Sequence, residues 1–170
     1  MLFLSKFFLS YILLTLLYQL YLSQFTVDEI DGITRVVSKH TELLMSVFKA
    51  DFQIASVANE DFLRLIYNGN YVARMIEGCN AVSVIILFTS FIFSFSGKLN
   101  VTVIYIFLGS CMIYFLNVIR IALLCVLMFH YPENEGLLHG VLFPLFIYGI
   151  VFVLWLIWVN KLSSYGKRNP

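Results

Sequence analysis

The stretch that decides the fold is residues 101–129, VTVIYIFLGSCMIYFLNVIRIALLCVLMF, in which Arg120 is the only charged residue. A helix needs about 20 mostly apolar residues to cross the roughly 30 Å hydrocarbon core of a bilayer. This stretch therefore predicts a membrane span. Three further apolar stretches, on both sides of it, predict spans at about residues 7–22, 80–95 and 138–159.

The composition of the whole chain agrees with this assignment. Of its 170 residues, 61% are hydrophobic and 12% are charged, against about 45–50% and about 25% in typical soluble domains. A soluble domain of this size cannot bury so much apolar surface. The net charge of +1 excludes the basic surface of a nucleic-acid-binding protein. We therefore expect an all-α polytopic membrane protein, a single membrane domain over residues 1–170 whose surroundings are the lipid bilayer.

The positions of lysine and arginine predict the orientation of the spans. Lys6 precedes the first span and Lys98 lies between the second and the third, whereas the short loop 130–137 has neither lysine nor arginine. Three basic residues follow the fourth span: Lys161, Lys167 and Arg168. Both termini are therefore expected in the cytoplasm, with residues 23–78 outside the cytoplasmic (inner) membrane. The first span lacks a pair of small residues for signal-peptide cleavage, so we expect it to be a retained anchor.

Two local structures are predicted within the outer segment, residues 23–78. Apolar residues recur at helical spacing from Ile30 to Phe48, which is typical of an amphipathic helix. Such a helix either lies on the membrane surface or packs on the spans. Two β-prone runs, Phe62–Tyr67 and Tyr71–Ile76, flank Asn68-Gly69, a pair that favours the type I′ turn of a β-hairpin.

Three reactive or charged side chains are expected at one membrane depth. Cys79 begins the second span on the outer side, where the positive end of a helix favours a thiolate. Arg120 lies about 20 residues into the third span, so at about 1.5 Å per residue it also reaches the outer boundary. His139 begins the fourth span on that same side.

Supporting side chains lie beside two of these residues. Asn117 precedes Arg120 by one helical turn, where it could hold the guanidinium. Glu77 and Asn80 are polar neighbours of Cys79.

This set of side chains is suited to acyl transfer. A thiolate attacks a carbonyl carbon and forms a thioester, and histidine moves protons to the leaving amine. A guanidinium stabilises the oxyanion of the tetrahedral intermediate. No metal or cofactor is expected, because the histidine spacings of a zinc protease are absent from the sequence.

Two other readings of these residues remain open. Arg120 could form a stabilising ion pair with Glu77 or Glu133 in a non-enzymatic membrane assembly or transport subunit. Cys79 could form a disulfide with Cys125 in an oxidising compartment.

The order of these motifs resembles a known family. Cys79 in Glu77-Gly78-Cys79-Asn80-Ala81, Arg120 in Asn117-Val118-Ile119-Arg120-Ile121, and His139 before Phe143-Pro144 are similar to the exosortase/archaeosortase signature. The resemblance covers about residues 71–158 and is greatest to the short exosortases of Bacteroidetes, the XrtF type. Many members carry Ser/Thr-Gly after the cysteine, where this chain has Asn80-Ala81, and similar short members often carry an acidic residue where it has Gly140.

The resemblance implies a membrane cysteine transpeptidase with its active site facing the periplasm. Its partners would be membrane-anchored substrate proteins whose C-terminal sorting signal it cleaves, and an acceptor, a lipid or a glycan, to which it transfers them. Cys79 would be the nucleophile, His139 the general acid/base and Arg120 the oxyanion stabiliser.

Overall fold

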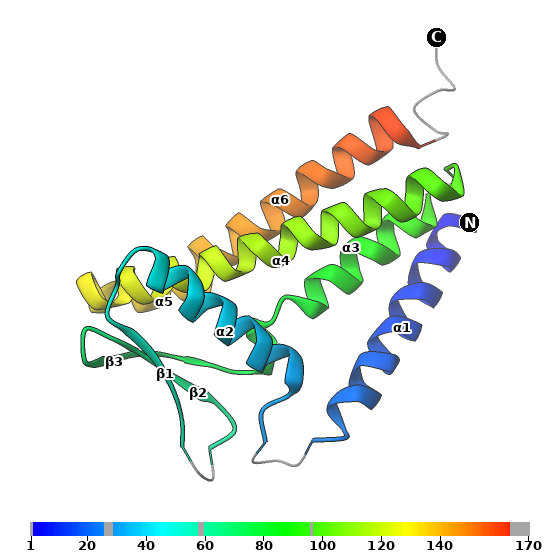
Figure 1. Cartoon of the computed structure of the whole chain (residues 1–170). Coiled ribbons are helices and arrows are strands. Elements are labelled where there is room, and N and C mark those ends of the chain that lie inside the picture. The colour runs from blue at the N-terminus through cyan, green and yellow to red at the C-terminus, as the bar shows by residue number, and fades with distance from the viewer. Residues whose placement is uncertain (1, 26–28, 58–59, 96, 164–170) are drawn as a thin grey trace.

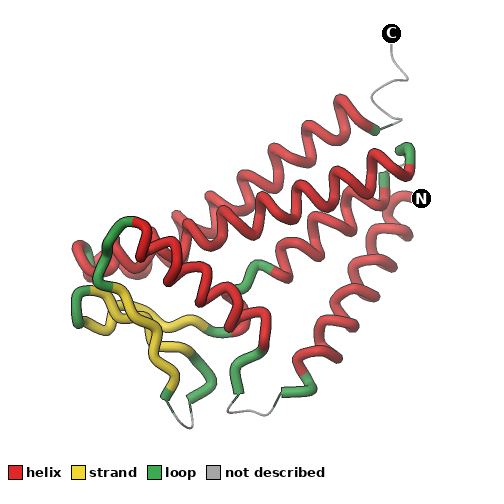
Figure 2. Tube along the Cα trace, viewed as in Figure 1, coloured by secondary structure: helices red, strands yellow, loops and turns green. Residues whose placement is uncertain are grey.

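The computed structural model describes residues 2–25, 29–57, 60–95 and 97–163. The helices are α1 (Leu2–Leu22), α2 (Gly32–Val47), α3 (Val82–Ser94), α4 (Leu99–His130), α5 (Glu135–Leu137) and α6 (Phe143–Ile157), and the strands are β1 (Phe52–Ser56), β2 (Leu63–Tyr67) and β3 (Asn70–Met75). The helices α1, α3, α4 and α6 form a bundle, and the sheet with α2 lies at one end of it (Figure 1, Figure 2). We call that end the sheet end.

Three helical segments of the described chain are long and apolar enough to cross a membrane: Phe3–Leu22, Leu99–His130 and Pro132–Leu162. They are consistent with a multi-pass membrane protein, and they contain the predicted spans at 7–22, 101–129 and 138–159.

The predicted span at residues 80–95 is shorter than expected. It corresponds to α3, which is apolar but has 13 residues. At about 1.5 Å per residue α3 is about 20 Å long, less than the roughly 30 Å of a hydrocarbon core. The expected count of four spans is therefore not confirmed.

Helix α3 lies antiparallel to α1 along most of its length. At one end the rings of Phe3 and Phe95 are 4.5 Å apart. At the other end Asn80, just before α3, donates a hydrogen bond to the Tyr18 hydroxyl at 2.8 Å. The beginning of α1 and the end of α3 therefore lie together, opposite the sheet end (Figure 1).

A glycine allows α3 to approach α4 closely. A Cβ on Gly109 of α4 would lie 2.4 Å from the Phe88 ring of α3, so no larger residue fits without displacing that ring. Farther from the sheet, Phe91 of α3 stacks on Trp155 of α6 with ring centroids 4.2 Å apart. Helix α3 therefore packs against α1, α4 and α6, and these contacts involve a glycine or aromatic rings.

The sheet is antiparallel, with strand order β1-β2-β3. The predicted hairpin is confirmed: β2 and β3 pair, and Asn68 and Gly69 have φ values of 49° and 74°, as a type I′ turn requires. The sequence analysis missed β1, so the expectation of an all-α fold is corrected to a mostly helical chain with a small three-stranded sheet.

The predicted amphipathic helix is present as α2. Asp31 caps its N-terminus by accepting hydrogen bonds from the amides of Ile33 and Thr34 at 2.8 and 3.0 Å. Its buried residues include Val37 and Met45. These pack against the sheet and α4, which confirms the alternative in which the helix packs on the spans.

The last third of α4 belongs to the core of the sheet end. One buried cluster joins α2, the three strands and the C-terminal part of α4; its α4 members are Val118, Ile121, Ala122 and Cys125. A single helix therefore runs from the bundle into the sheet end. Arg120 lies on α4 where these two environments meet.

Candidate functional site

Cys79 lies in the connection between the sheet and the bundle. It ends the 3₁₀ turn Glu77–Cys79, four residues after β3, and is half-buried. The expectation that Cys79 begins the span helix is wrong, because α3 begins at Val82. Ala81 has a left-handed φ of 65°, so the chain changes direction between the cysteine and the helix.

Asn80 fixes this connection to three parts of the fold. Its Nδ2 donates to the hydroxyls of Tyr18 in α1 at 2.8 Å and Thr34 in α2 at 3.1 Å. Its Oδ1 accepts from the amide of Val82 at 3.0 Å. Asn80 is 2% exposed, and buried polar groups with partners of this kind are costly to remove. The predicted supporting residue is therefore a structural link that positions its neighbour Cys79.

Asn117 holds the cysteine from the side of α4. Its Nδ2 donates to the Cys79 carbonyl oxygen at 2.8 Å, and its side chain is buried. From the sequence, Asn117 was predicted to hold the guanidinium of Arg120; the amide instead binds the Cys79 backbone, because the turn Glu77–Cys79 lies against α4. This bond uses the carbonyl group and leaves the thiol available.

Arg120 lies one turn beyond Asn117 on α4 and within electrostatic range of Cys79. Its Nε is buried and has no hydrogen-bond partner among the described residues. The side chain lines an otherwise apolar cavity of about 420 Å³ between α4 and α6. Arg120 makes no ion pair with Glu77 or Glu133 in the described chain, where the recorded ion pair joins Arg64 to Glu60. A permanent cation in apolar surroundings, unmatched by an acid, is suited to bind a negatively charged or strongly polar oxygen.

His139 lies in a wide π-helical turn, Leu138–Leu142, which leads into α6. Its side chain is exposed, whereas the adjacent Leu138 and the later Phe143 are buried against α4. Within the described residues no contact joins His139 to Cys79 or Arg120. Such π turns are rare and occur often at functional sites.

Glu77 precedes Cys79 by two residues and is half-buried. Burial raises the pKa of the Glu77 carboxyl above its usual value, and the negative charges of Asp31 and Asp61 raise it further. The local electrostatics therefore disfavour the ionised form of this carboxyl.

Sequence reasoning missed three polar side chains at the site. Tyr18 and Thr34 bind Asn80, and Tyr148 of α6 lies within electrostatic range of Arg120. Tyrosines near span ends are common as interfacial residues, so the sequence offers no signal that separates these roles. The other two cysteines are free thiols apart from this site, Cys111 exposed on α4 and Cys125 in the core, and the Cys79–Cys125 disulfide does not form in this structure.

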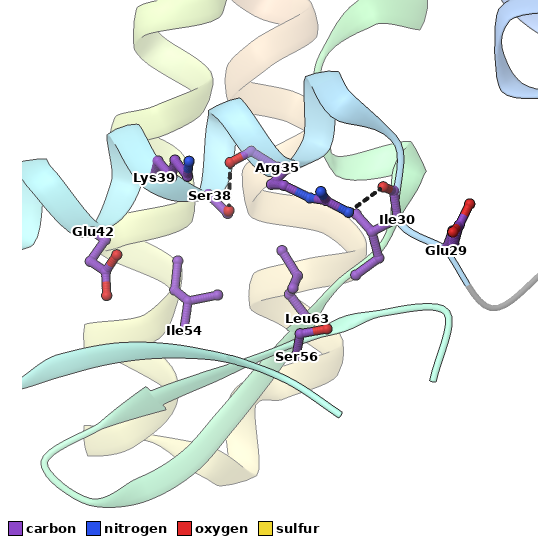
Figure 3. A pocket seen from close by; sticks show the side chains of 9 residues that line it. All are labelled: Glu29, Ile30, Arg35, Ser38, Lys39, Glu42, Ile54, Ser56 and Leu63. Carbon is purple, nitrogen blue, oxygen red and sulfur yellow. Dashed lines mark hydrogen bonds between the residues drawn. The ribbon is translucent and has the colours of Figure 1, made fainter. Parts of the chain in front are cut away.

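A second cleft lies in the sheet end, between α2 and the face of β1 and β2 (Figure 3). It has a volume of about 390 Å³. Arg35 and Lys39 line it from α2, and Ile54 and Leu63 from the sheet. Arg35 donates to the Ile30 carbonyl oxygen at 3.3 Å. None of the three predicted catalytic residues lines this cleft.

The chain was compared with models of protein families, with curated proteins and with solved structures, and none of them matches it.

Proposed function

We propose that this chain is a membrane cysteine transpeptidase of the exosortase type. It would cleave the C-terminal sorting signal of exported, membrane-anchored proteins at the outer face of the cytoplasmic membrane. The observation that carries the proposal is the hydrogen bond from Asn117 to the Cys79 carbonyl, which joins the turn of a half-buried cysteine to α4 one helical turn before Arg120. The order of Cys79, Arg120 and His139 along the chain supports the same function.

The proposed topology has four crossings, with α3 as the second. Helix α3 runs beside α1 from the level of Tyr18 to that of Phe3. The part of α1 from Phe3 to Tyr18 extends over about 22 Å. Helix α4 then begins at the end opposite the sheet (Figure 1), so α3 returns the chain across the bundle. This arrangement supports termini on one side of the membrane and the sheet end on the other, and the positions of lysine and arginine favour the cytoplasm for the termini.

In the proposed reaction the Cys79 thiolate attacks the carbonyl carbon of the scissile peptide bond. The developing oxyanion is stabilised by the Arg120 guanidinium. The carbon–nitrogen bond breaks as His139 gives a proton to the leaving amine, and a thioester remains on Cys79. A nucleophile of the acceptor, or water in a hydrolase, then attacks the thioester, His139 takes its proton, and the thiolate is released.

The separation of His139 from Cys79 requires one further step in this mechanism. The imidazole lies on an exposed turn, so the turn Leu138–Leu142 must move toward Cys79 when substrate is bound. Catalytic hydrogen bonds are often long in free enzymes and shorten in the complex. We therefore expect substrate binding to order this turn.

The test begins with a search of the neighbouring reading frames, and of the C-termini of the proteins encoded in the same genome, for a shared sorting signal. Several proteins that share one short motif, an apolar span and a basic tail would supply a substrate for co-expression. The wild-type chain is expected to shorten this substrate and to form a hydroxylamine-sensitive adduct on Cys79. Cys79→Ala should abolish both, whereas Cys111→Ala is the matched control that should retain them.

Processing of the substrate by Cys79→Ala would overturn the proposal. That result would favour the non-enzymatic reading, a membrane assembly or transport subunit, which tolerates loss of the thiol and of the His139 imidazole.

A further inference from the structure

An apolar furrow runs along one side of the contact between α4 and α6. Two neighbouring cavities, of about 420 and 540 Å³, share Leu145 and Phe146 of α6 as wall residues. The first contains Arg120 and the second contains Gly149. The two cavities are therefore parts of one continuous surface, which we call the α4–α6 furrow.

The walls of the furrow are two stripes with helical spacing. The α4 wall consists of Met112, Leu116, Arg120, Leu123 and Leu127, and the α6 wall includes Leu142, Phe146, Gly149, Val153 and Ile157. From the first to the last residue of the α4 wall the furrow is about 22 Å long. Most of a bilayer's hydrocarbon core is therefore covered by this surface.

Two contacts join the walls of the furrow to one another. The Tyr105 hydroxyl of α4 donates to the Leu154 carbonyl oxygen of α6 at 2.8 Å. At the sheet end, Leu124 packs with Leu138 and Phe143. The furrow is thus a preformed surface whose two walls are held together within the chain.

Two features of the furrow distinguish it from ordinary lipid-facing surface. A Cβ added to Gly149 would meet no atom within 4 Å, so the wall is open at this point and another backbone can approach it closely, as small residues allow in membrane helix pairs. Arg120 is the one charged residue of either cavity wall, and its buried Nε has no partner within the described chain.

We propose that the α4–α6 furrow binds one transmembrane helix of a partner protein. The outer end of that helix would present an oxygen acceptor, a backbone carbonyl or a carboxylate, to Arg120. The apolar walls fit the side chains of the helix, and Gly149 allows its backbone to approach closely. The oxygen acceptor of the helix would be the partner that the buried Nε of Arg120 lacks within the described chain. Because Asn117, one turn before Arg120 on α4, binds the Cys79 carbonyl oxygen, a helix in the furrow would have its outer end near the turn that carries the thiol.

This inference deepens the proposed function, since it gives the sorting signal's membrane helix a binding surface. It rests on the proposed function only for the cleavage of the sorting signal that contains this helix. Binding in the furrow does not require the thiol, so the two proposals can fail separately.

The first experiment is photo-cross-linking in phosphatidylcholine vesicles. Benzoylphenylalanine replaces Leu116 or Val153 inside the furrow, or the adjacent Phe115 or Phe152, which lie outside its walls. The probe is a synthetic peptide with a leucine–alanine helix of about 20 residues, lysines at its inner end and a glutamate at its outer end. Leu116 and Val153 variants are expected to cross-link to the peptide at least roughly tenfold more than their neighbours.

Equal cross-linking at all four positions, or cross-linking to lipid alone in the furrow, would overturn the inference. A Cys79→Ala background should leave the cross-linking unchanged. If substrate processing fails while furrow cross-linking persists, the proposed function is contradicted and the proposed binding surface is supported.

A substitution that fills the furrow sharpens the test. Gly149→Leu has open space for its side chain and replaces glycine in a helix, so the protein should fold at least as well as the wild type. It should nevertheless lower cross-linking from Leu116 by roughly tenfold. Gly136→Leu, also in open space but outside the furrow, is the matched control. Unchanged cross-linking in Gly149→Leu would contradict the proposal.

The charge of Arg120 is tested by exchange. Arg120→Glu should reverse the preference of the furrow, so that a peptide with lysine at its outer end cross-links better than the glutamate peptide. A preference for neither peptide in both the wild type and Arg120→Glu would show that the guanidinium does not recognise the partner.

Discussion

The two sides of Arg120 differ in how firmly their functional residues are held. On the Cys79 side, buried asparagines connect the 3₁₀ turn to α1, α2, α3 and α4 through hydrogen bonds of 2.8–3.1 Å. On the His139 side, the imidazole is exposed on a π-helical turn and makes no hydrogen bond, ion pair or ring contact within the described residues. The proposed nucleophile is thus fixed by the fold, whereas the proposed acid/base would depend on a change at the beginning of α6.

This difference indicates a division of roles. Residues that hold Cys79 are expected to contribute to stability, because each has a buried partner that would be left unsatisfied. His139 has no such partner and should contribute to the reaction alone. The following substitutions separate these contributions, in order of expected effect.

His139→Ala should have the largest effect on function and almost none on stability. We expect substrate processing to fall below detection, since the proposed mechanism assigns both proton transfers to this imidazole. The thermal unfolding temperature in detergent should stay within about a degree of the wild type, because substitutions at exposed sites change stability by less than about 0.5 kcal/mol. His130→Ala, an exposed histidine at the end of α4, is the control and should process substrate normally.

Asn80→Ala should have the largest effect on stability. It removes three hydrogen bonds and leaves the buried Thr34 hydroxyl without its amide partner. Lost buried bonds of this kind cost about 1–3 kcal/mol each, with partial compensation, so we expect a destabilisation of about 2–4 kcal/mol in a detergent unfolding titration. Asn70→Ala, an exposed asparagine in the hairpin, should change stability far less; an equal loss in both variants would contradict this role for Asn80.

Asn117→Ala should affect both stability and chemistry. The Cys79 carbonyl would lose its donor, at a cost of about 1–3 kcal/mol, and the turn would no longer be fixed beside Arg120. We expect slower processing and a changed rate of Cys79 alkylation in the same protein. A variant with wild-type alkylation and processing would show that Asn117 does not position the cysteine.

Ala81→Gly should stabilise the chain slightly. Ala81 has a φ of 65°, a conformation that costs a non-glycine residue roughly 1 kcal/mol and glycine very little. The expected gain is up to about 1 kcal/mol, measured by thermal unfolding beside Ala55→Gly in β1, which should be destabilising. Destabilisation by Ala81→Gly would indicate that the methyl group's burial outweighs the backbone strain.

Glu77→Gln should produce the smallest effect, visible as a change in pH dependence. The pKa of Glu77 is raised in the folded chain by burial and by Asp31 and Asp61. The folded state therefore binds the proton more tightly than the unfolded state, and stability falls as the pH rises from the unfolded pKa through the folded one. Glu77→Gln should be more stable than the wild type at neutral pH and equal to it below pH about 4. A difference that persists at the lower pH would have another cause.

The elements predicted correctly from the sequence depend on local signals. The stretches that became α1, α4 and α6 carry enough apolar residues to identify them, and Asn68-Gly69 fixes the hairpin turn. Strand β1 was missed although Phe52 and Ile54 alternate with polar Gln53; five residues give a weak signal. The later beginning of α3, at Val82, was missed because the chain turns at Asn80 and Ala81, and this turn depends on the tertiary hydrogen bonds of Asn80.

For the candidate site, the sequence predicted that Cys79 and Arg120 lie at one depth, and the structure joins the turn of Cys79 to α4 one helical turn before Arg120. It could not assign Asn117 to the Cys79 carbonyl, because that bond depends on how the 3₁₀ turn packs against α4. The exposure of His139 likewise depends on the π turn. Residue type and spacing do not encode such a turn.

The most direct test of the central claim is the labelling of Cys79 from outside intact cells. A chain in which Cys111→Ser and Cys125→Ser leave one thiol is treated with a membrane-impermeant maleimide, with Lys98→Cys in a Cys79→Ser background as the cytoplasmic control. We predict that Cys79 is labelled without permeabilisation, whereas the cysteine at position 98 requires it. Labelling of Cys79 only after the membrane is opened, or only after the protein is unfolded, would contradict an outward-facing thiol beside Arg120.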